Sequence, residues 1–277
     1  MIIDSHCHCG KGDGLTGPWD TDASLGAYLK RADAAGITHT VLFSAFHSDY
    51  RTANRRVAQI VLENPRRLTG YAFLHAEHDR GRVGSLVREA VEQHGFRGIK
   101  VHRYDARISR EICEAARMYR LPVLYDVVGE VSAVELLATE YPDVNFIIPH
   151  LGSFADDWRA QRALIEPLVR HRNVYTDTSG IRRFDLLAEA VSRAGAHKIL
   201  FGTDGPWLHP GVELAKVNAL KLHSAEENLV LSGNVLRLLG PARPATLLPV
   251  LSGANAARRP ASRAFSDPWL SLPGNRL

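Results

Sequence analysis

The chain has 277 residues, of which 45% are hydrophobic and 23% charged, and its formal net charge is +4. This length and apolar content suit one large hydrophobic core. No apolar run approaches the roughly 18 residues that a membrane-spanning helix needs, and the first predicted strand leaves no room for a signal peptide. Three cysteines cannot all pair, which suits a reducing compartment. We therefore expect a cytoplasmic protein that does not bind membranes.

The excess of basic residues raises the question of nucleic-acid binding. Arginines are scattered through the predicted helices beside glutamates, and no basic stripe with interleaved aromatic residues appears. Solvated helix faces account for this distribution. We expect a small-molecule substrate as partner and no nucleic acid.

Short β-branched or aromatic runs alternate with amphipathic helical patterns along the chain. The first helical pattern follows Thr21 or Asp22 as a cap and stops at Gly36. Later helical patterns lie near residues 51–63, 82–94, 109–119, 130–140, 158–171 and 183–195. The strand candidates are residues 1–6, 38–45, 68–74, 97–102, 121–127, 144–150, 173–178 and 198–203.

Eight strands alternating with helices over about 240 residues match a (β/α)8 barrel in number and length, with a doubly wound open sheet as the alternative. We predict an α/β fold: a single-domain TIM barrel formed by residues 1–240, with a terminal helical segment from Ser224 to near Gly240. Residues 241–277 are rich in Pro, Ala, Arg and Ser. This irregular tail is expected to be disordered, or to pack on the barrel or on a second subunit, which leaves a homo-oligomer open.

The first strand carries the most specific chemical signal, the segment Asp4-Ser5-His6-Cys7-His8. Alternate residues of an extended chain share one face, so Asp4, His6 and His8 are expected to point the same way. Two imidazoles at this spacing can bind one metal ion while the carboxylate orients one of the rings. The alternative is a chance or structural pair, so a metal site needs further ligands elsewhere in the chain.

Polar side chains recur where the predicted strands end. The loops after the strands of such a barrel build one face, and the chemistry of these folds gathers there. A lone histidine at a strand end is usually just hydrogen-bonded to a loop. Many polar residues at the strand ends together favour a functional site. It comprises His6, His8, His47, His75, Glu77, Lys100, His102, Asp126, His150, Asp177 and Asp204.

Several segments resemble the amidohydrolase superfamily of metal-dependent barrel hydrolases, in the order in which that family has them. The chain is most similar to the amidohydrolase-related branch, which includes hydrolases, lactonases, a hydratase and non-oxidative decarboxylases. The resemblance therefore implies a metal-dependent barrel enzyme without fixing the reaction. The matching segments are residues 3–8, 98–102, 122–124, 146–152, 173–180 and 199–204, and residues 232–240 resemble the closing helix of the family.

The resemblance also implies roles for individual residues. His6 and His8 would be metal ligands, and Asp204 would bind the metal and accept a proton from the attacking water. His150 would contact the metal-bound water or the substrate, or become a ligand if there are two metals. Lys100 lies where some two-metal members carry a carbamylated lysine, but a cation that binds a substrate carboxylate is the preferred interpretation.

The chain departs from the family after the fifth strand, where a histidine ligand is usual and Asp126 stands instead. A carboxylate oxygen can replace an imidazole nitrogen as a zinc ligand, and it shifts the preference toward harder ions such as manganese. We predict that Asp126 is a metal ligand. The alternatives are that Asp126 only orients a ligand, or that the site is degraded.

Two further residues are candidates for substrate binding. His102 lies two residues after Lys100 on the fourth strand, and Arg182 directly follows the seventh strand at the same face. An arginine or lysine there can bind an anionic substrate.

The predicted function is a metal-dependent hydrolase that cleaves an amide, lactone or ester bond of a small organic substrate. One divalent ion, zinc first and manganese next, would lower the pKa of its bound water to about 7, and Asp204 or His150 would move the proton. A non-oxidative decarboxylase or hydratase on the same metal is the alternative. A catalytically silent binding protein is an alternative of another class.

Overall fold

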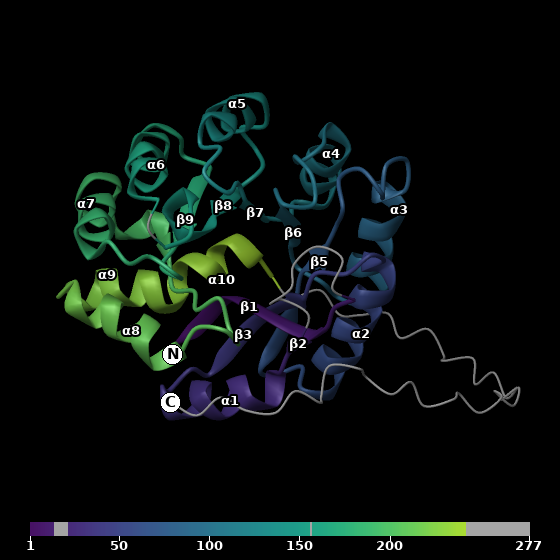
Figure 1. Ribbon diagram of the computed structural model, residues 1–277, viewed down its shortest axis with the longest axis horizontal. Helices are drawn as coiled ribbons and strands as arrows, with labels where there is room; N and C mark the ends of the chain where they lie inside the picture. Colours follow the sequence, from purple (N-terminus) through teal and green to yellow (C-terminus); the bar gives the residue numbers. More distant parts are fainter. Residues whose placement is uncertain (14–21, 156, 242–277) are drawn as a thin grey trace, which may run out of the picture. The chain divides into compact units, whose positions relative to one another are not determined.

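Parallel strands form the centre of the computed structural model, which describes residues 1–13, 22–155 and 157–241 (Figure 1). These residues belong to one unit, Met1–Leu247. The predicted tail from residue 242 onward and the predicted cap Thr21 lie outside them. The barrel strands are β1 (Ile3–Lys11), β3 (His39–Ser44), β4 (Leu68–Gly70), β5 (Ala72–Phe73), β6 (Ile99–His102), β7 (Val123–Asp126), β8 (Phe146–Ile148), β9 (Val174–Asp177) and β10 (Ile199–Leu200).

The strands close into a barrel. β1 pairs with β3, β3 with β4, and β5 to β10 pair in succession, all in parallel. β4 and β5 continue one another across Tyr71, so they count as one barrel strand. The ring closes between β10 and β1, where Ser5 N donates to Phe201 O at 2.9 Å and Cys7 forms a parallel bridge with Gly205. The predicted eight-stranded barrel is therefore confirmed, and the open sheet is excluded.

Helices surround the barrel (Figure 1) because parallel neighbours need crossover connections, which cover the outer side of the strands. Short π- and 3-10-helical turns occur at Glu89–Gln93, Pro149–Gly152, Ala196–Lys198 and Leu229–Gly233. The helices are α1 (Leu25–Ala34), α2 (Tyr50–Glu63), α3 (Val83–Arg88), α4 (Arg110–Tyr119), α5 (Ser132–Glu140), α6 (Trp158–Arg170), α7 (Phe184–Ala194), α8 (Pro210–Ala219), α9 (Ser224–Asn228) and α10 (Asn234–Leu239).

The start of α1 corrects the sequence-based prediction. The helix begins after Ser24, because Asp22 and Ala23 form the short strand β2 (Asp22–Ala23), antiparallel to the end of β1. The N-cap position belongs to Ser24, two residues after Asp22.

Helix α8 was not predicted from the sequence. One of the side chains on its buried face is the charged Glu213, which interrupts the apolar stripe that identifies an amphipathic helix. Pro210 in its first turn and His209 as its N-cap define where it starts.

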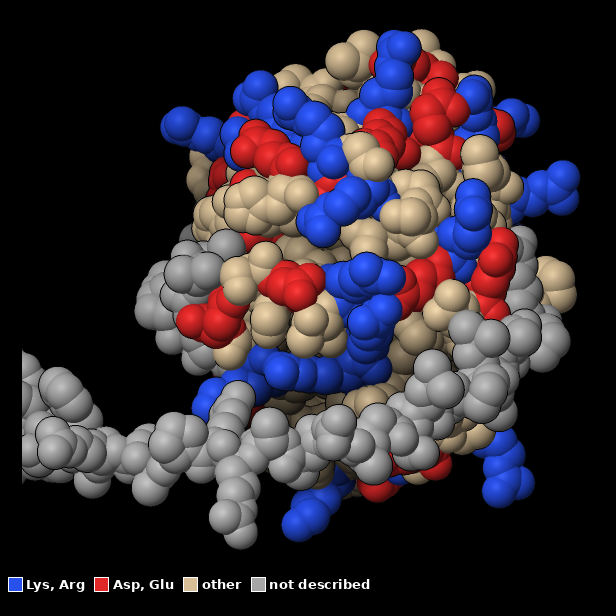
Figure 2. Space-filling view, turned by 90° about the vertical axis from the view of Figure 1, so that its right-hand side faces the viewer, with Lys and Arg blue, Asp and Glu red and all other residues tan. Residues whose placement is uncertain are grey.

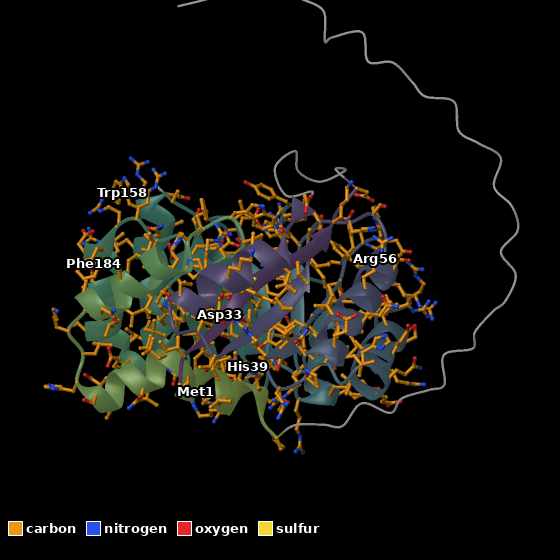
Figure 3. The ribbon with its side chains drawn as sticks, turned by 90° about the horizontal axis from the view of Figure 1, so that it is seen from below. Met1, Asp33, His39, Arg56, Trp158 and Phe184 are labelled. Carbon is orange, nitrogen blue, oxygen red and sulfur yellow. The ribbon has the colours of Figure 1, made fainter. Side chains whose placement is uncertain are left out.

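Basic and acidic side chains are interspersed on the face shown in Figure 2. Arg51 and Arg55 of α2, for example, both pair with Glu89, at 2.8 and 2.7 Å. Figure 3 shows the partly exposed Trp158 and Phe184 on the outer helices α6 and α7, well away from Arg56. Within the part of the chain that the structure describes, no helix is both long and apolar enough to cross a membrane.

The end of the barrel where the strands begin is closed by α10, which crosses the middle of the ring of helices in Figure 1. Val235, Leu238 and Leu239 join the apolar side chains of the barrel interior in one cluster. Asn234 donates its Nδ2 to Ile199 O at 2.7 Å, at the start of β10. The barrel interior at this end is therefore a packed core.

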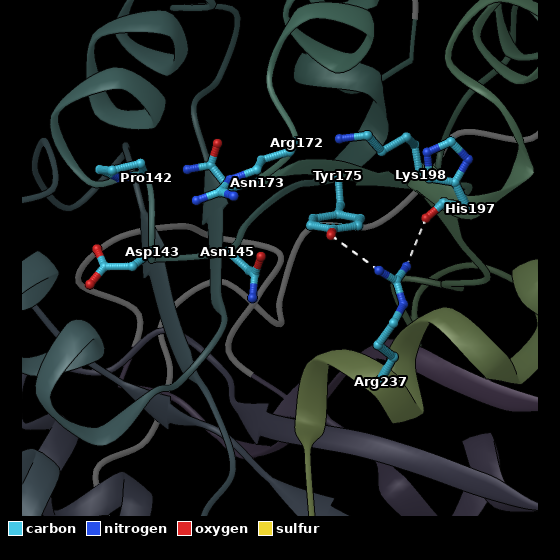
Figure 4. A pocket seen from close by; sticks show the side chains of 9 residues that line it. All are labelled: Pro142, Asp143, Asn145, Arg172, Asn173, Tyr175, His197, Lys198 and Arg237. Carbon is cyan, nitrogen blue, oxygen red and sulfur yellow. Dashed lines mark hydrogen bonds between the residues drawn. The ribbon is translucent and has the colours of Figure 1, made fainter.

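A cavity of about 460 Å³ lies beside α10 at this closed end (Figure 4). Lys198 and Arg237 both flank the ring of Tyr175, at 4.9 and 5.5 Å from its centroid. Lys198 donates to Val174 O at 2.9 Å, and Arg237 donates to His197 O at 3.0 Å. These cations bind backbone carbonyls around the starts of β9 and β10, so their contacts are structural.

Candidate active site

Three predicted ligands lie close together: His6 and His8 within β1, and Asp204 in the segment after β10. His6 Nε2 lies 3.2 Å and His8 Nε2 3.6 Å from Asp204 Oδ1. One ligand atom from each residue lies within 4.8 Å of the other two. Although nearly two hundred positions separate them, they meet because β1 and β10 form the closing seam of the barrel.

Both imidazole rings form a hydrogen bond through Nδ1 with a residue outside this cluster, and their Nε2 atoms face Asp204. His6 Nδ1 donates to Asp177 Oδ2 at 2.8 Å, and His8 Nδ1 donates to Ser44 O at 3.0 Å. In a neutral imidazole the second nitrogen then carries a lone pair. Burial holds the pKa of His8 well below its usual value, which keeps that ring neutral at pH 7.

These residues fit a divalent ion. His6 Nε2 is buried and has no hydrogen-bond partner among the described residues. Burial and Lys100 oppose protonation of His6, yet Asp177 and Asp204 outweigh them and raise its pKa, so the site attracts positive charge. Burial likewise opposes ionisation of Asp204, but the neighbouring histidines hold its pKa well below the usual range. Two imidazole nitrogens and one carboxylate are ligands that both zinc and manganese accept.

Asp4 does not orient an imidazole ring, contrary to the expectation from the alternation of β1. The pairing register of β1 shifts between Asp4 and Cys7, and Asp4 Oδ2 accepts from Tyr28 and Thr203 hydroxyls, each at 2.5 Å. The carboxylate that orients His6 is instead Asp177, at the end of β9. The sequence marks Asp177 as a polar strand end but gives no reason to connect it with β1.

Asp126 lies between two histidines. Its Oδ2 is 3.2 Å from His102 Nε2 and 3.5 Å from His150 Nε2, and its Oδ1 accepts from Val128 N at 3.0 Å. Burial opposes ionisation of Asp126, but the two histidines hold its pKa well below the usual range. His102 Nδ1 accepts from Tyr104 N at 3.1 Å, which leaves the Nε2 proton to donate to Asp126.

His150 follows β8 with a left-handed backbone, φ 57°. Its Nδ1 donates to Ser179 O at 2.9 Å, which directs Nε2 toward Asp126. Burial disfavours the charged ring, but the contact with Asp126 and the nearby Asp204 outweigh burial and raise the pKa of His150 to about 9. At neutral pH and without a metal ion nearby, His150 is therefore a proton donor.

Comparison with known proteins identifies the family. The sequence profile of a family described as amidohydrolase matches residues 3–240. The chain belongs to the amidohydrolase family. No curated protein matches the sequence.

Solved structures share the amidohydrolase fold at low sequence identity. A dihydroxybenzoic acid decarboxylase from Polaromonas sp., with bound manganese and the inhibitor 2-nitroresorcinol, is 17% identical with a TM-score of 0.68, covering 86% of this chain and 96% of its own. An amidohydrolase from Burkholderia multivorans with bound zinc is 15% identical with a TM-score of 0.70, covering 86% and 99%. A probable 2-pyrone-4,6-dicarboxylic acid hydrolase from Acinetobacter baumannii is 16% identical with a TM-score of 0.67, covering 86% and 98%.

Lys100 is a buried cation at the centre of this amidohydrolase barrel. Its side chain is fully buried, and its Nζ has no hydrogen-bond partner among the described residues. Burial lowers its pKa, while Asp126 and Asp204 partly offset that effect. The nearest aromatic contact is Phe43, with Nζ 5.0 Å from the ring centroid. An ammonium without a fixed partner is free to bind a negatively charged group.

Aromatic rings flank the amidohydrolase site. The His8 ring lies 4.5 Å from Phe43 and 4.8 Å from Trp207, and the Phe154 ring meets His150 edge-on at 5.1 Å. Trp207 and Phe154 are absent from the residues that sequence reasoning selects, because aromatic residues in loops carry no spacing signal. Arg182 lies exposed beyond β9, and its contact with substrate stays a prediction.

Proposed function

We propose that this protein is a metal-dependent hydrolase that cleaves an amide, lactone or ester bond of a small organic substrate. The observation that carries the proposal is the convergence of His6, His8 and Asp204 within 4.8 Å, with His150 beside them. Zinc is the first choice of metal and manganese the second, because the ligand set accepts both.

The residues of the site have complementary roles. A divalent ion held by His6, His8 and Asp204 would supply Lewis acidity toward a carbonyl group and toward water. Asp204, whose pKa is held low, would accept the proton of the attacking water. His150, whose pKa is raised to about 9, would protonate the leaving group. Lys100 would bind a carboxylate of the substrate.

Asp126 is proposed as a further ligand on the basis of its place after the fifth strand. Its contacts with His102 and His150 support the alternative. In that role Asp126 is not a metal ligand, but it orients His150 and favours the protonated form of its ring. In the second role the carboxylate of Asp126, together with Asp204 and Asp177, raises the pKa of His150.

Non-oxidative decarboxylation is the second candidate. A protonated His150 can deliver a proton to carbon, and the unpartnered Lys100 can bind the carboxylate that is lost or a second one. One of the structural relatives described above is a decarboxylase, and the fold is shared by both kinds of enzyme.

The test is an assay of purified protein loaded with zinc or manganese, using cyclic amides, lactones and aromatic carboxylates. Hydrolysis is read from acid release and decarboxylation from carbon dioxide release. The proposal expects acid release that disappears in H6A/H8A. Carbon dioxide release alone would replace hydrolysis by decarboxylation. Metal-free protein after purification and reconstitution would favour a silent binding protein.

A further inference from the structure

The loop after β9, residues Thr178 to Ile181, lies between α8 and the candidate catalytic residues. Ser179 O accepts from His150 Nδ1 at 2.9 Å, and Ser179 Oγ donates to Asp177 Oδ1 at 2.6 Å. Asp177 in turn accepts from His6. The geometry of this loop therefore fixes both the ring of His150 and the carboxylate that orients His6.

Glu213 of α8 binds the same peptide group that holds His150. Gly180 N donates to Glu213 Oε2 at 3.1 Å, while the carbonyl of that peptide group, Ser179 O, accepts from His150 Nδ1. A carboxylate on the N–H of a peptide group polarises it and makes its carbonyl a stronger acceptor. Glu213 and His150 are thus connected through one peptide group.

Lys216, one turn further along α8, holds the two ends of the loop. Its Nζ donates to Thr178 O at 2.8 Å and to Ile181 O at 3.1 Å, and it lies 2.6 Å from Glu213 Oε2. Its three ammonium protons therefore have three partners. The pair binds the loop at Thr178, Gly180 and Ile181, on both sides of Ser179.

The burial of Glu213 beside a partly buried lysine calls for an explanation. Glu213 is only 5% exposed, and burial raises its pKa, although Lys216 and Gly180 N–H oppose that effect. A buried ion pair usually contributes less to stability than apolar residues of the same size, so stability alone does not account for one here. What distinguishes this pair is that its partners lie in the loop that binds His150.

We propose that Glu213 is a positioning residue for His150, acting through the Ser179–Gly180 peptide group to keep a proton on His150 Nδ1. Lys216 pairs with Glu213 and holds the loop. The inference rests on the proposed function, in which His150 donates a proton from Nε2. With Nδ1–H held by Ser179 O, the ring presents Nε2 toward Asp126.

The first test is nitrogen-15 NMR of the histidine rings in the full chain, with His150 assigned by comparison with H150N. E213Q keeps the shape of the side chain and removes its charge. In metal-free protein at a pH above the pKa of His150, where the ring is neutral, we expect the Nδ1–H proton of His150 to move upfield in E213Q, and the two ring nitrogens to shift toward values typical of mixed tautomers. E166Q, which removes an exposed acid paired with Arg193, is the matched control and should leave the His150 signals unchanged.

Kinetics supply a second readout. E213Q should lower kcat about tenfold, the effect expected of a residue that orients a catalytic group, with little change in KM. If E213Q does not fold, E213Q/K216M replaces it, because that variant leaves no unpaired buried charge, and the same upfield shift is expected.

Unchanged His150 ring signals in a folded E213Q or E213Q/K216M would overturn the positioning role, whatever the activity. Shifted ring signals in a protein that turns over none of the tested substrates would leave the positioning role intact and count against the proposed function alone.

Discussion

At the scale of single residues, each of the two histidine ligand candidates on β1 is held by a partner on another strand. His6 is fixed by Asp177 of β9, and His8 by the Ser44 carbonyl of β3. Fixing Nδ1 selects the tautomer in which Nε2 is the metal-binding atom. The site is therefore preorganised for a cation by hydrogen bonds on the far side of each ring.

Alanine at His6 or His8 should remove bound metal and activity together while the fold persists. Each substitution deletes one of three converging ligand atoms, and no backbone hydrogen bond of β1 depends on these rings. Metal content measured by atomic emission, with circular dichroism as the check on folding, tests this. Retention of one equivalent of metal by the double variant H6A/H8A would contradict the proposed site.

The protonation of His150 predicts how activity changes at high pH. In its proposed role His150 acts as an acid, so activity should fall as the pH rises through its pKa, which is about 9 in the absence of metal and lower beside a bound cation. D126N removes the charge that raises this pKa and should move the fall in activity to lower pH. Profiles of kcat/KM against pH, recorded with the same metal, compare the unsubstituted protein with D126N. If the fall in activity at high pH does not move, another group is responsible for it.

Replacement of His150 itself tests whether it is an acid or a ligand. H150N should lower turnover by roughly a hundredfold or more with nearly unchanged metal content. Parallel loss of metal would make His150 a ligand and favour a two-metal site.

The role of Asp126 is decided by metal affinity. If Asp126 is a ligand, D126A should weaken metal binding strongly and D126H should preserve the site. If Asp126 only holds His102 and His150, affinity should fall on the order of ten- to a hundredfold. Titration with zinc distinguishes the two roles, and unaltered affinity would exclude both.

At the scale of elements, the loop after β9 needs a glycine at its centre. Gly180 has φ 63°, and a Cβ there would lie 2.5 Å from the Phe154 ring and 3.2 Å from His150 Nδ1. The loop packs this closely because it holds His150 on one side and meets α8 on the other. A larger residue has to displace either the ring of Phe154 or that of His150.

G180A should therefore reduce both stability and turnover. The positive φ alone costs about 1 kcal/mol or more for a residue with a side chain, and the contact with Phe154 adds to it. Urea denaturation measures the stability change. The double variant G180A/F154A relieves the contact but not the backbone strain, so it should recover part of the turnover. No recovery would show that the contact with Phe154 is unimportant.

At the scale of the whole molecule, the proposed metal site lies across the seam that closes the barrel. His6 and His8 belong to β1, and Asp204 follows β10. A cation that binds all three links the first and last strands, and because it binds only the folded state it should stabilise that state.

Saturating zinc should raise the thermal midpoint, and a chelator should lower it again. A hundredfold excess over the dissociation constant corresponds to about 2.7 kcal/mol. The shift is measured by differential scanning fluorimetry and should vanish in H6A/H8A. An equal shift in that variant would place the stabilising metal elsewhere.

The sequence by itself determined the order and the approximate bounds of the barrel strands. Buried parallel strands are short β-branched runs, and the helices between them carry periodic apolar faces, so both leave a local signal. The sequence also selected His6 and His8 by their alternate spacing on the first strand and Asp204 by its resemblance to the family, and the structure brings these three residues together. Helix α8 was not predicted from the sequence, because the buried Glu213 interrupts its apolar face.

Only the tertiary structure decided which of these polar strand ends act on one another. The pairing of Asp177 with His6, of Asp126 with His102 and His150, and of Glu213 with the loop after β9 joins residues from separate elements. These contacts follow from barrel closure, from a register shift in β1 and from loop conformations. Such features depend on packing throughout the barrel and leave no pattern in any one segment of the chain.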